Sequence, residues 1–422
     1  GTTTVNTGTL LVNNGAGSGT GTGNVIVNNS AVFGGTGSIA GSVTMNNTSR
    51  LAPGASVESL ATGSVTWTSG TFFDVEIDGT AGAGLPGGHD ILNVSGTVTL
   101  GGATLNLIGT PVGVPNSGVL QTFTIIDNNG TVDAVSGTFA GLPEGAPVSF
   151  NGGLFFISYV GGDGNDVVLS SQLMGSLAAD TIVVTPVSAS SVQYQINGGT
   201  PVTLAGITSF TFNGLAGDDL MRVNLNANVL PSGGIFYNGG DQDTPLSAGS
   251  DGQDGDVLQV IGTLTQTATY FGDADLSATL DRDGTVLIDL QGTITFTQLE
   301  PVDMQSLAVA NVTFEGGNDI ISIADGFDAD TGLDASLVIS GTSNKFSAEP
   351  FESVHLRNNT TVNIDTTTVD GSDMITISSG VSTHGNVNFN ILTGNFSDVV
   401  TIAGSLTVTG NIGITSQSIA FT

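Results

Sequence analysis

The residues best suited to chemistry are the aspartates of one glycine-rich stretch, Gly161 to Leu169, which reads GGDGNDVVL. It matches the nonapeptide G-G-x-G-x-D-x-U-x, in which aspartates and backbone carbonyl groups of successive coils share calcium ions. Asp163 and Asp166 would be the ligands. Such nonapeptides work in tandem, however, and the full motif occurs once in this chain. A purely structural corner is the other interpretation, and the one that we favour.

A second candidate calcium site is the acidic stretch from Gly239 to Asp256. Calcium takes six to eight oxygen ligands, and a long loop rich in carboxylates can supply them. The other interpretation is a solvated acidic loop, which needs no ion. Calcium is therefore a possible cofactor, and we expect none to be required. The candidate ligands of this loop are Asp241, Asp243, Asp251, Asp254 and Asp256.

Both candidates belong to a wider pattern, in which a turn is followed by aspartate and then by an apolar run. Aspartate side chains bond readily to backbone N–H groups of their own turn, which ends one strand and starts the next. We therefore expect these aspartates to be corner residues. They are Asp90, Asp166, Asp219, Asp256, Asp319, Asp373 and Asp398.

Catalytic constellations are weak by comparison. Two aspartate pairs at i, i+2 spacing, Asp273/Asp275 and Asp281/Asp283, would share a strand face as a glycoside hydrolase requires. Sugar sites also use aromatic platforms, and the chain has one Trp and four Tyr. The solitary histidines are expected to be surface or corner residues, and the basic residues are widely spaced. We predict no enzymatic activity. These residues are His89, His355, His384, Arg50, Arg222, Arg282, Lys345 and Arg357.

Charge and composition exclude several partners. Five Lys and Arg face 37 Asp and Glu among 422 residues, for a formal net charge of −32. Such a chain repels nucleic acid and anionic headgroups. It has no cysteine, so neither disulfides nor thiolate metal sites form. No apolar stretch approaches the roughly 18 residues of a membrane span.

The elements that must position these residues are short strands. From Val400 to the end, apolar pairs start at residues 400, 406, 412 and 419, and three such steps span 19 residues. That is the length of one coil in a three-sided solenoid, whose stacked coils pair every backbone group with the coils above and below. The sequence predicts an all-β protein, a parallel β-solenoid with about three short strands per coil.

Asparagine pairs support stacked coils. Asparagine tolerates left-handed backbone conformations at corners, and its amide can bond to the equivalent amide of the next coil. Several of these residues also lie in N-x-Ser/Thr sequons, at Asn28, Asn47, Asn129 and Asn359, so glycosylation is the alternative role. The pairs are Asn13-Asn14, Asn28-Asn29, Asn46-Asn47, Asn128-Asn129 and Asn358-Asn359.

The first part of the chain resembles a known repeat. The order "GTLLVNN", "FGGTGSIAG", "LAPGAS", "HDILNVSGTVTLGGATLNL" and "ISYVGGDGNDVVL" is similar to the autotransporter-associated β-strand repeat and covers residues 1–171. The remainder resembles the repeat arrays of very large surface proteins of planctomycete-type bacteria. The resemblance implies a right-handed parallel β-helix that is extracellular, displayed at or released from the cell surface.

Three units are expected: residues 1–171, the more acidic residues 172–310, and residues 311–422. The terminal stretches "GTTTVNTGTLLV" and "NIGITSQSIAFT" show no cap, so we expect head-to-tail contact with another copy or with further chain. The predicted function is structural and non-catalytic: a rod, fibre, stalk or coat segment at the bacterial cell surface. The alternatives are an adhesin that binds a ligand such as a cell-surface glycan and, third, a polysaccharide-active enzyme.

Overall fold

The computed structural model describes residues 1–110, 120–129, 133–241, 255–272, 283–299, 301–314, 316–328, 334–343 and 349–422. Within these ranges the chain forms strands and no helix, which confirms the predicted all-β class. No helix that could cross a membrane occurs in them. The chain forms two compact units, Gly1–Ser176 and Leu177–Thr422. The predicted unit 311–422 and all but the first five residues of the predicted unit 172–310 thus lie in the second compact unit.

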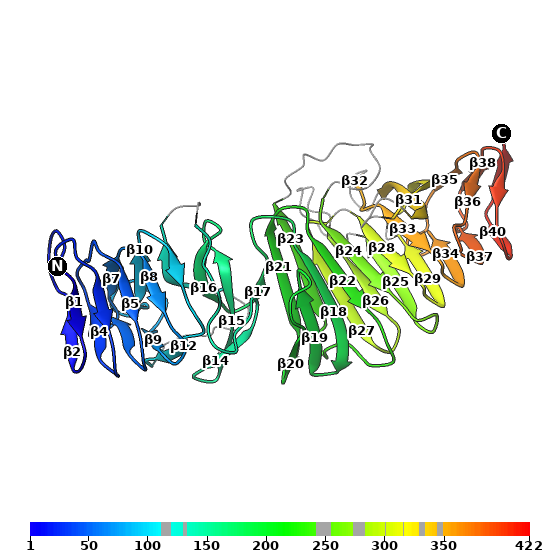
Figure 1. Cartoon of the computed structure of the whole chain (residues 1–422). Helices are drawn as coiled ribbons and strands as arrows, with labels where there is room; N and C mark the ends of the chain where they lie inside the picture. Colours follow the sequence, from blue (N-terminus) through cyan, green and yellow to red (C-terminus); the bar gives the residue numbers. More distant parts are fainter. Residues whose placement is uncertain are drawn as a thin grey trace. The chain divides into compact units, whose positions relative to one another are not determined.

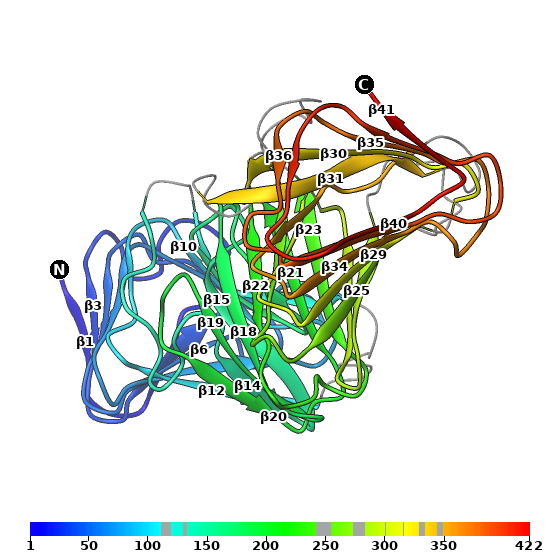
Figure 2. The same cartoon turned by 90° about the vertical axis from the view of Figure 1, so that its right-hand side faces the viewer.

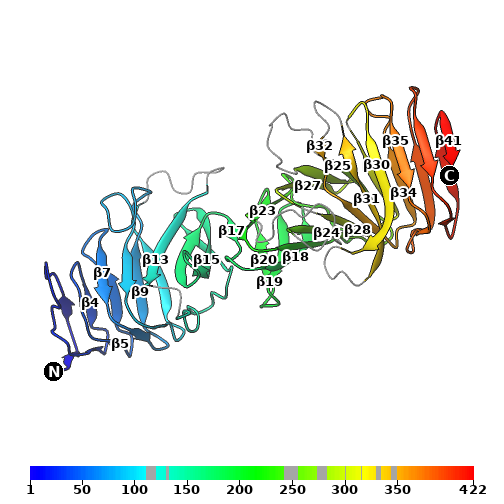
Figure 3. The ribbon, with the colours of Figure 1, turned by 90° about the horizontal axis from the view of Figure 1, so that it is seen from above.

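The first unit has three sheets, seen as blue-to-cyan strands in Figures 1 and 3. Sheet 1 contains β1 (Thr3–Val5), β3 (Val25–Val27), β5 (Val43–Met45), β8 (Val65–Trp67) and β11 (Val98–Thr99). Sheet 2 contains β2 (Thr9–Leu11), β4 (Val32–Gly35), β6 (Arg50–Pro53), β9 (Phe72–Glu76) and β12 (Thr104–Ile108). Sheet 3 contains β7 (Ser59–Thr62), β10 (Ile91–Val94), β13 (Thr122–Asn128), β16 (Asp166–Ser170), β15 (Gly153–Gly161) and β14 (Pro147–Phe150). A short strand, β17 (Leu173–Met174), follows them.

The order of the strands repeats. From β5 to β13 the chain visits sheets 1, 2 and 3 in that order three times. The strand pairs within sheets 1 and 2 are parallel, as are β7–β10 and β10–β13. The chain thus returns to each sheet beside the strand that it left on its previous visit, as stacked passes require.

The second unit is built on two long sheets, seen in green to red in Figure 1. Sheet 4 contains, in spatial order, β21 (Phe210–Ala216), β23 (Ile235–Asp241), β27 (Gly292–Thr297), β26 (Gly284–Ile288), β25 (Thr267–Gly272), β29 (Val309–Thr313), β34 (Thr361–Asp365), β37 (Asn388–Leu392) and β40 (Ile412–Thr415). Sheet 5 contains β20 (Val202–Ala205), β19 (Ser191–Ile196), β18 (Thr181–Ser188), β22 (Leu220–Asn224), β24 (Val257–Ile261), β28 (Val302–Gln305), β33 (Val354–Arg357), β31 (Ala335–Ser343), β30 (Ile320–Phe327), β35 (Met374–Ile377), β38 (Val399–Ile402) and β41 (Ser418–Phe421). Strand β32 (Glu349–Pro350) pairs with β31, and β36 (Val381–Ser382) pairs with β39 (Leu406–Thr407).

The end of this unit repeats a simple path. Strands β34 to β41 visit sheet 4, sheet 5 and the β36–β39 pair in turn, and Figure 2 shows the chain circling there in nearly superposed loops. The four apolar runs predicted at residues 400, 406, 412 and 419 are β38, β39, β40 and β41. Inward positions are fully buried, such as Val362 and Ile364 of β34 and Phe389 and Ile391 of β37.

The prediction of purely parallel pairing is wrong in four places, because the sheets are mixed. Antiparallel pairs join β14–β15–β16–β13, β18–β19–β20, β25–β26–β27 and β30–β31, and β31 is also antiparallel to β32 and β33. Several of these strands are longer than the predicted short runs, with nine residues in β15 and in β31. Antiparallel neighbours need only a tight turn, whereas parallel ones need a crossover.

Candidate functional site

The nonapeptide at Gly161 to Leu169 forms the turn of an antiparallel hairpin. Strands β15 and β16 flank it, and Gly161 lies opposite Asp166. Asp163 is exposed at this turn, while Asp166 is 8% exposed and its Oδ1 accepts the N–H of Asn128 at 2.9 Å. Burial, aided by Asp127 and Asp163, raises the pKa of Asp166. The hairpin differs from the successive parallel passes that a shared calcium site requires.

The acidic loop lies mostly outside the described residues, which include neither Asp243 nor Asp251 nor Asp254. Asp241 ends β23. Asp256 is described, is 0% exposed and lies immediately before β24. In the described ranges no three His, Cys, Asp or Glu side chains come together as a metal site. Calcium at this loop or at the hairpin therefore stays a prediction.

Asp256 belongs to what we call the first aspartate ladder, which consists of Asp180, Asp219 and Asp256. The backbone N–H of Asp180 donates to Asp219 Oδ1 at 2.6 Å, and that of Asp219 donates to Asp256 Oδ1 at 2.8 Å. The three residues immediately precede β18, β22 and β24, which are neighbours in sheet 5. The carboxyl groups of Asp219 and Asp256 thus extend the hydrogen-bonding of the sheet past the ends of β22 and β24.

A second aspartate ladder, Asp319, Asp373 and Asp398, has the same geometry. The N–H of Asp319 donates to Asp373 Oδ1 at 2.9 Å, and the N–H of Asp373 donates to Asp398 Oδ1 at 3.0 Å. In the first unit, Asp90 accepts the N–H groups of Glu58 and Glu76, both at 2.8 Å. The expectation that these aspartates bond within their own turn is wrong. Asp90, Asp373 and Asp398 accept backbone N–H groups that lie at least 14 residues away along the chain, and Asp319 Oδ1 accepts the hydroxyl group of Ser343 at 2.7 Å.

Burial controls the electrostatics of the first ladder. Desolvation, together with neighbouring carboxylates, raises the pKa of Asp219 to about 8 and that of Asp256 to about 7. Asp219 Oδ2 and Asp256 Oδ2 are buried without a hydrogen-bond partner in the described residues. A Cβ on Gly214 would lie 2.1 Å from Asp219 Oδ2, and one on Gly239 would lie 2.3 Å from Asp256 Oδ2. Only glycine leaves room for these carboxyl groups.

Amide ladders occupy other corners. Asn28 donates through Nδ2 to Asn6 Oδ1 at 3.1 Å and accepts from Asn46 Nδ2 at 3.2 Å, which confirms the predicted amide stacking there. Asn29 and Asn47 have φ of 52° and 48°, the predicted left-handed conformation. The sequon residue Asn359 is fully buried.

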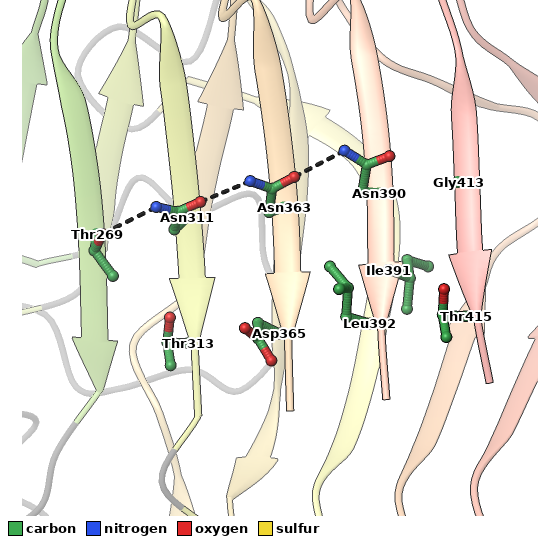
Figure 4. Close-up of a pocket in the computed structure, with 10 residues that line it drawn as sticks. All are labelled: Thr269, Asn311, Thr313, Asn363, Asp365, Asn390, Ile391, Leu392, Gly413 and Thr415. Atoms are coloured by element: carbon green, nitrogen blue, oxygen red, sulfur yellow. Dashed lines mark hydrogen bonds between the residues drawn. The ribbon is translucent and has the colours of Figure 1, made fainter. Parts of the chain in front are cut away.

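A groove on the outward face of sheet 4 was not foreseen (Figure 4). It encloses about 470 Å³. Three asparagines, which we call the amide row, cross it: Asn311, Asn363 and Asn390. Each is the middle residue of a five-residue strand, β29, β34 and β37. Asparagine at the centre of three similar strands is the sequence pattern from which the amide row could have been predicted. The remaining lining residues are Thr269, Thr313, Asp365, Ile391, Leu392, Gly413 and Thr415.

The residues considered for catalysis are dispersed. Of the two aspartate pairs only Asp283 is described, and its Oδ1 accepts the N–H of Gln298 at 3.2 Å. His355 is 2% exposed rather than at the surface; its Nδ1 contacts the carbonyl oxygen of Phe327 at 2.6 Å, and burial lowers its pKa. Arg50 forms an ion pair with Asp74 at 2.6 Å, whereas Arg282 and Lys345 lie outside the described residues.

The remaining histidines and Arg357 also make structural contacts. His89 is 5% exposed, and burial lowers its pKa, so of the two expected positions it occupies a corner, beside the turn before β10, and not the surface. His384 lies 2.9 Å from Asp325 and has φ of 44°, as a corner residue would. Arg357 pairs with Asp328 at 3.5 Å. Comparison of the chain with protein families, with curated proteins and with solved structures finds no match.

Proposed function

We propose that this chain is a segment of a non-catalytic, extracellular structural protein of a bacterial cell surface, part of a rod, fibre, stalk or coat. In this proposal the repeating path through the sheets is a right-handed parallel β-solenoid with about three short strands per coil, into which antiparallel hairpins are inserted. The resemblance of residues 1–171 to an autotransporter repeat supports the surface location.

One observation carries the proposal. The aspartates that open the strands, which are the most regular charged feature of the sequence, are buried against the backbone of neighbouring strands. Asp219, Asp256 and Asp373 are each at most 1% exposed and accept a backbone N–H. Carboxylates in this arrangement hold successive passes of chain together. They support a role in building an extended array of strands, as a structural segment needs.

Assembly is the second part of the proposal. Strands β40 and β41 each have a hydrogen-bonded neighbour on one side only among the described strands. Ile412, Ile419 and Phe421 on these strands are 47%, 42% and 77% exposed. Unpaired strand edges with apolar side chains recruit further strands. We propose that these edges pair head-to-tail with further chain or with a second copy.

The test is the double substitution Ile412→Lys and Ile414→Lys, which places two charges on the edge strand. Sedimentation velocity at rising concentration should show association of the unsubstituted chain and loss of that association in the variant. Ile320→Lys is the matched control, because Ile320 is 55% exposed on β30, which has neighbours on both sides. An unsubstituted chain that stays monomeric, or a double variant that associates as before, contradicts the proposal of assembly.

A ligand-binding adhesin is the second candidate function, and the groove on sheet 4 favours it. Its volume lies in the range of about 300 to 1,000 Å³ that is usual for ligand sites. The polysaccharide-active enzyme remains third. Release of reducing sugar from a panel of bacterial and plant polysaccharides would favour that third function over both others.

A further inference from the structure

We propose that the groove on sheet 4 binds a neutral, linear glycan, whose hydroxyl groups are read by the amide row and whose sugar rings pack on the aliphatic side chain beside it. The inference deepens the adhesin candidate, and it rests on the proposed surface location for the source of its ligand. It does not depend on whether the chain assembles into filaments.

The amide row is held in one orientation by its own hydrogen bonds (Figure 4). Asn390 Nδ2 donates to Asn363 Oδ1 at 2.8 Å, and Asn363 Nδ2 donates to Asn311 Oδ1 at 2.8 Å. Asn311 Nδ2 donates in turn to Thr269 Oγ1 at 3.0 Å. An amide group has two N–H bonds and two acceptor sites, so each asparagine retains bonding capacity toward the groove. The side chains are thus ordered before any ligand arrives, which reduces the entropic cost of binding.

The row is open at one end. Every amide donates in the same direction, so the dipoles align and polarise one another. The last acceptor, Asn390 Oδ1, faces β40 at the position where Gly413 lies opposite Asn390. A Cβ on Gly413 would lie 2.6 Å from this oxygen. Glycine therefore leaves Asn390 Oδ1 uncovered, and a ligand hydroxyl group is a fitting donor to it.

Beside the amide row lies a second row of side chains, which combines hydroxyl groups, one carboxylate and one aliphatic side chain. Register places Asp365 beside Thr313 on one side and Leu392 on the other, and Leu392 beside Thr415. Leu392 is 38% exposed and offers an aliphatic surface to the C–H face of a sugar ring. None of the described residues that line the groove is aromatic, so hydrogen bonds must provide most of the recognition. We expect weak binding at one groove, strengthened by many copies along a surface.

Charge sets the class of glycan. Within the described part of the chain, the lining contains one carboxylate, Asp365, and no Lys or Arg. The whole chain carries a formal net charge of −32. Polyanionic glycans are repelled by such a surface. Neutral sugars, whose hydroxyl groups both donate and accept, match amides and threonine hydroxyl groups without a charge penalty.

The spacing of the row suits a linear polymer. Adjacent strands lie about 4.8 Å apart, so the amides repeat at roughly that interval. This is close to the length that one sugar ring contributes to an extended chain. A glycan that runs across the strands can therefore present one hydroxyl group to each rung of the row.

The buried amide ladder at Asn359 has no such spare bonding capacity toward a ligand. At the corner residue Asn359, Oδ1 accepts the N–H of Leu307, and Nδ2 donates to Met304 O and to Asn386 Oδ1. Asn359 is fully buried. In contrast, Asn363 is half-buried on the face of the sheet, and its side-chain partners among the residues that the structure describes are Asn311 and Asn390. The amide row is therefore not needed to satisfy backbone groups.

The experiment measures binding of linear hexasaccharides of glucose, mannose and N-acetylglucosamine to the full chain by saturation-transfer NMR and titration calorimetry. At least one should bind, and Asn390→Leu should weaken that binding about tenfold, the equivalent of roughly 1.4 kcal/mol for one hydrogen bond. Gly413→Ala should weaken it similarly, because Asn390 Oδ1 must move away from the new Cβ, which then lies between it and the ligand. Gly413 has no left-handed φ, and the atom it would meet is the end of a side chain, so this variant should keep the melting temperature of the parent.

Asn6→Leu, which alters an amide ladder in the first unit, is the matched control and should leave affinity unchanged. The proposal is overturned if none of the three neutral hexasaccharides binds, or if Asn390→Leu and Gly413→Ala both bind like the parent. It is equally overturned if an anionic hexasaccharide of galacturonic acid binds more tightly than the neutral ones. Loss of sugar binding with intact filament assembly would remove this inference and leave the proposed structural function standing.

Discussion

Replacing Asp219 by asparagine should stabilise the second unit at alkaline pH and change little at acidic pH. Asparagine retains the Oδ1 atom that accepts the N–H of Asp180, and it carries no charge at any pH. Asp219 is 1% exposed and faces Asp180, Asp218 and Asp256, with the Tyr237 hydroxyl group donating to its backbone oxygen at 2.9 Å. Ionisation in this environment is therefore unfavourable.

The magnitude follows from the raised pKa. Folding raises the pKa of Asp219 from 3.8 to about 8, so between these values the folded state holds a proton that the unfolded state releases. Stability is fully present below the unfolded value and is lost as pH rises toward the folded one. At about 1.36 kcal/mol for each pKa unit, an isolated group would lose about 5 kcal/mol between pH 4 and pH 8. Local relaxation and water penetration reduce this, and we expect about 2 to 4 kcal/mol.

The assay is urea unfolding at pH 4.5, 6 and 8, with hydrogen exchange of β22 and β24 reporting on the second unit. Trp67, the sole tryptophan, is 1% exposed in the first unit, and its fluorescence is the internal control. At pH 8 Asp219→Asn should exceed the parent by about 2 to 4 kcal/mol, and at pH 4.5 the two should agree within about 1 kcal/mol. A parent whose second unit grows more stable from pH 4.5 to pH 8, or a variant with an equal gain at both, would refute the reasoning.

Two further predictions concern the same corners. Gly239→Ala should destabilise the second unit by about 2 kcal/mol or more, measured by urea unfolding, because its Cβ would lie 2.3 Å from Asp256 Oδ2 and 2.5 Å from Gln298 O. Gly15→Ala, which meets nothing within 4 Å, is the control and should unfold like the parent. Chelation of calcium should lower the melting temperature by no more than a few degrees, because hydrogen-bonded aspartates hold these corners without an ion. Collapse of the strand signal in chelator would instead establish Asp163 and Asp166, or the acidic loop, as a true metal site.

Local patterns predicted the strands well. The alternation of apolar and polar residues near the C-terminus located β38 to β41. Side chains along a strand point alternately to its two faces, so a strand with one buried face has an apolar residue at every second position. The direction of pairing has no such local signature. Strands β26 and β27 alternate like their parallel neighbours, yet they pair antiparallel through a turn in which Leu290 has φ of 62° and is 96% exposed. No glycine marks the left-handed residue of that turn.

The structural role of the strand-opening aspartates was predicted, but their bonding partners and the groove were not. That aspartate before a strand is structural follows from its short acceptor side chain. The hydrogen-bond partner of such an aspartate cannot be predicted in this way. Asp219 and Asp256 meet only through the register of β22 and β24, which is set by pairing between distant parts of the chain. The amide row depends on register in the same way. Asn311, Asn363 and Asn390 are far apart in the sequence, and only their common position within five-residue strands connects them.

The antiparallel hairpins should also form faster during folding than the parallel strand pairs. Phe327 lies opposite Ala335, eight residues later, whereas Val302 of β28 pairs with Val354 of β33, separated by 52 residues. Closing short loops takes far less time and entropy than closing long ones, and contacts between distant residues slow folding. The β30–β31 hairpin can therefore form before the parallel strands around it have met. It then offers β33 and β35 a finished edge on each side, so the insertions that interrupt the parallel order act as templates from which that order grows.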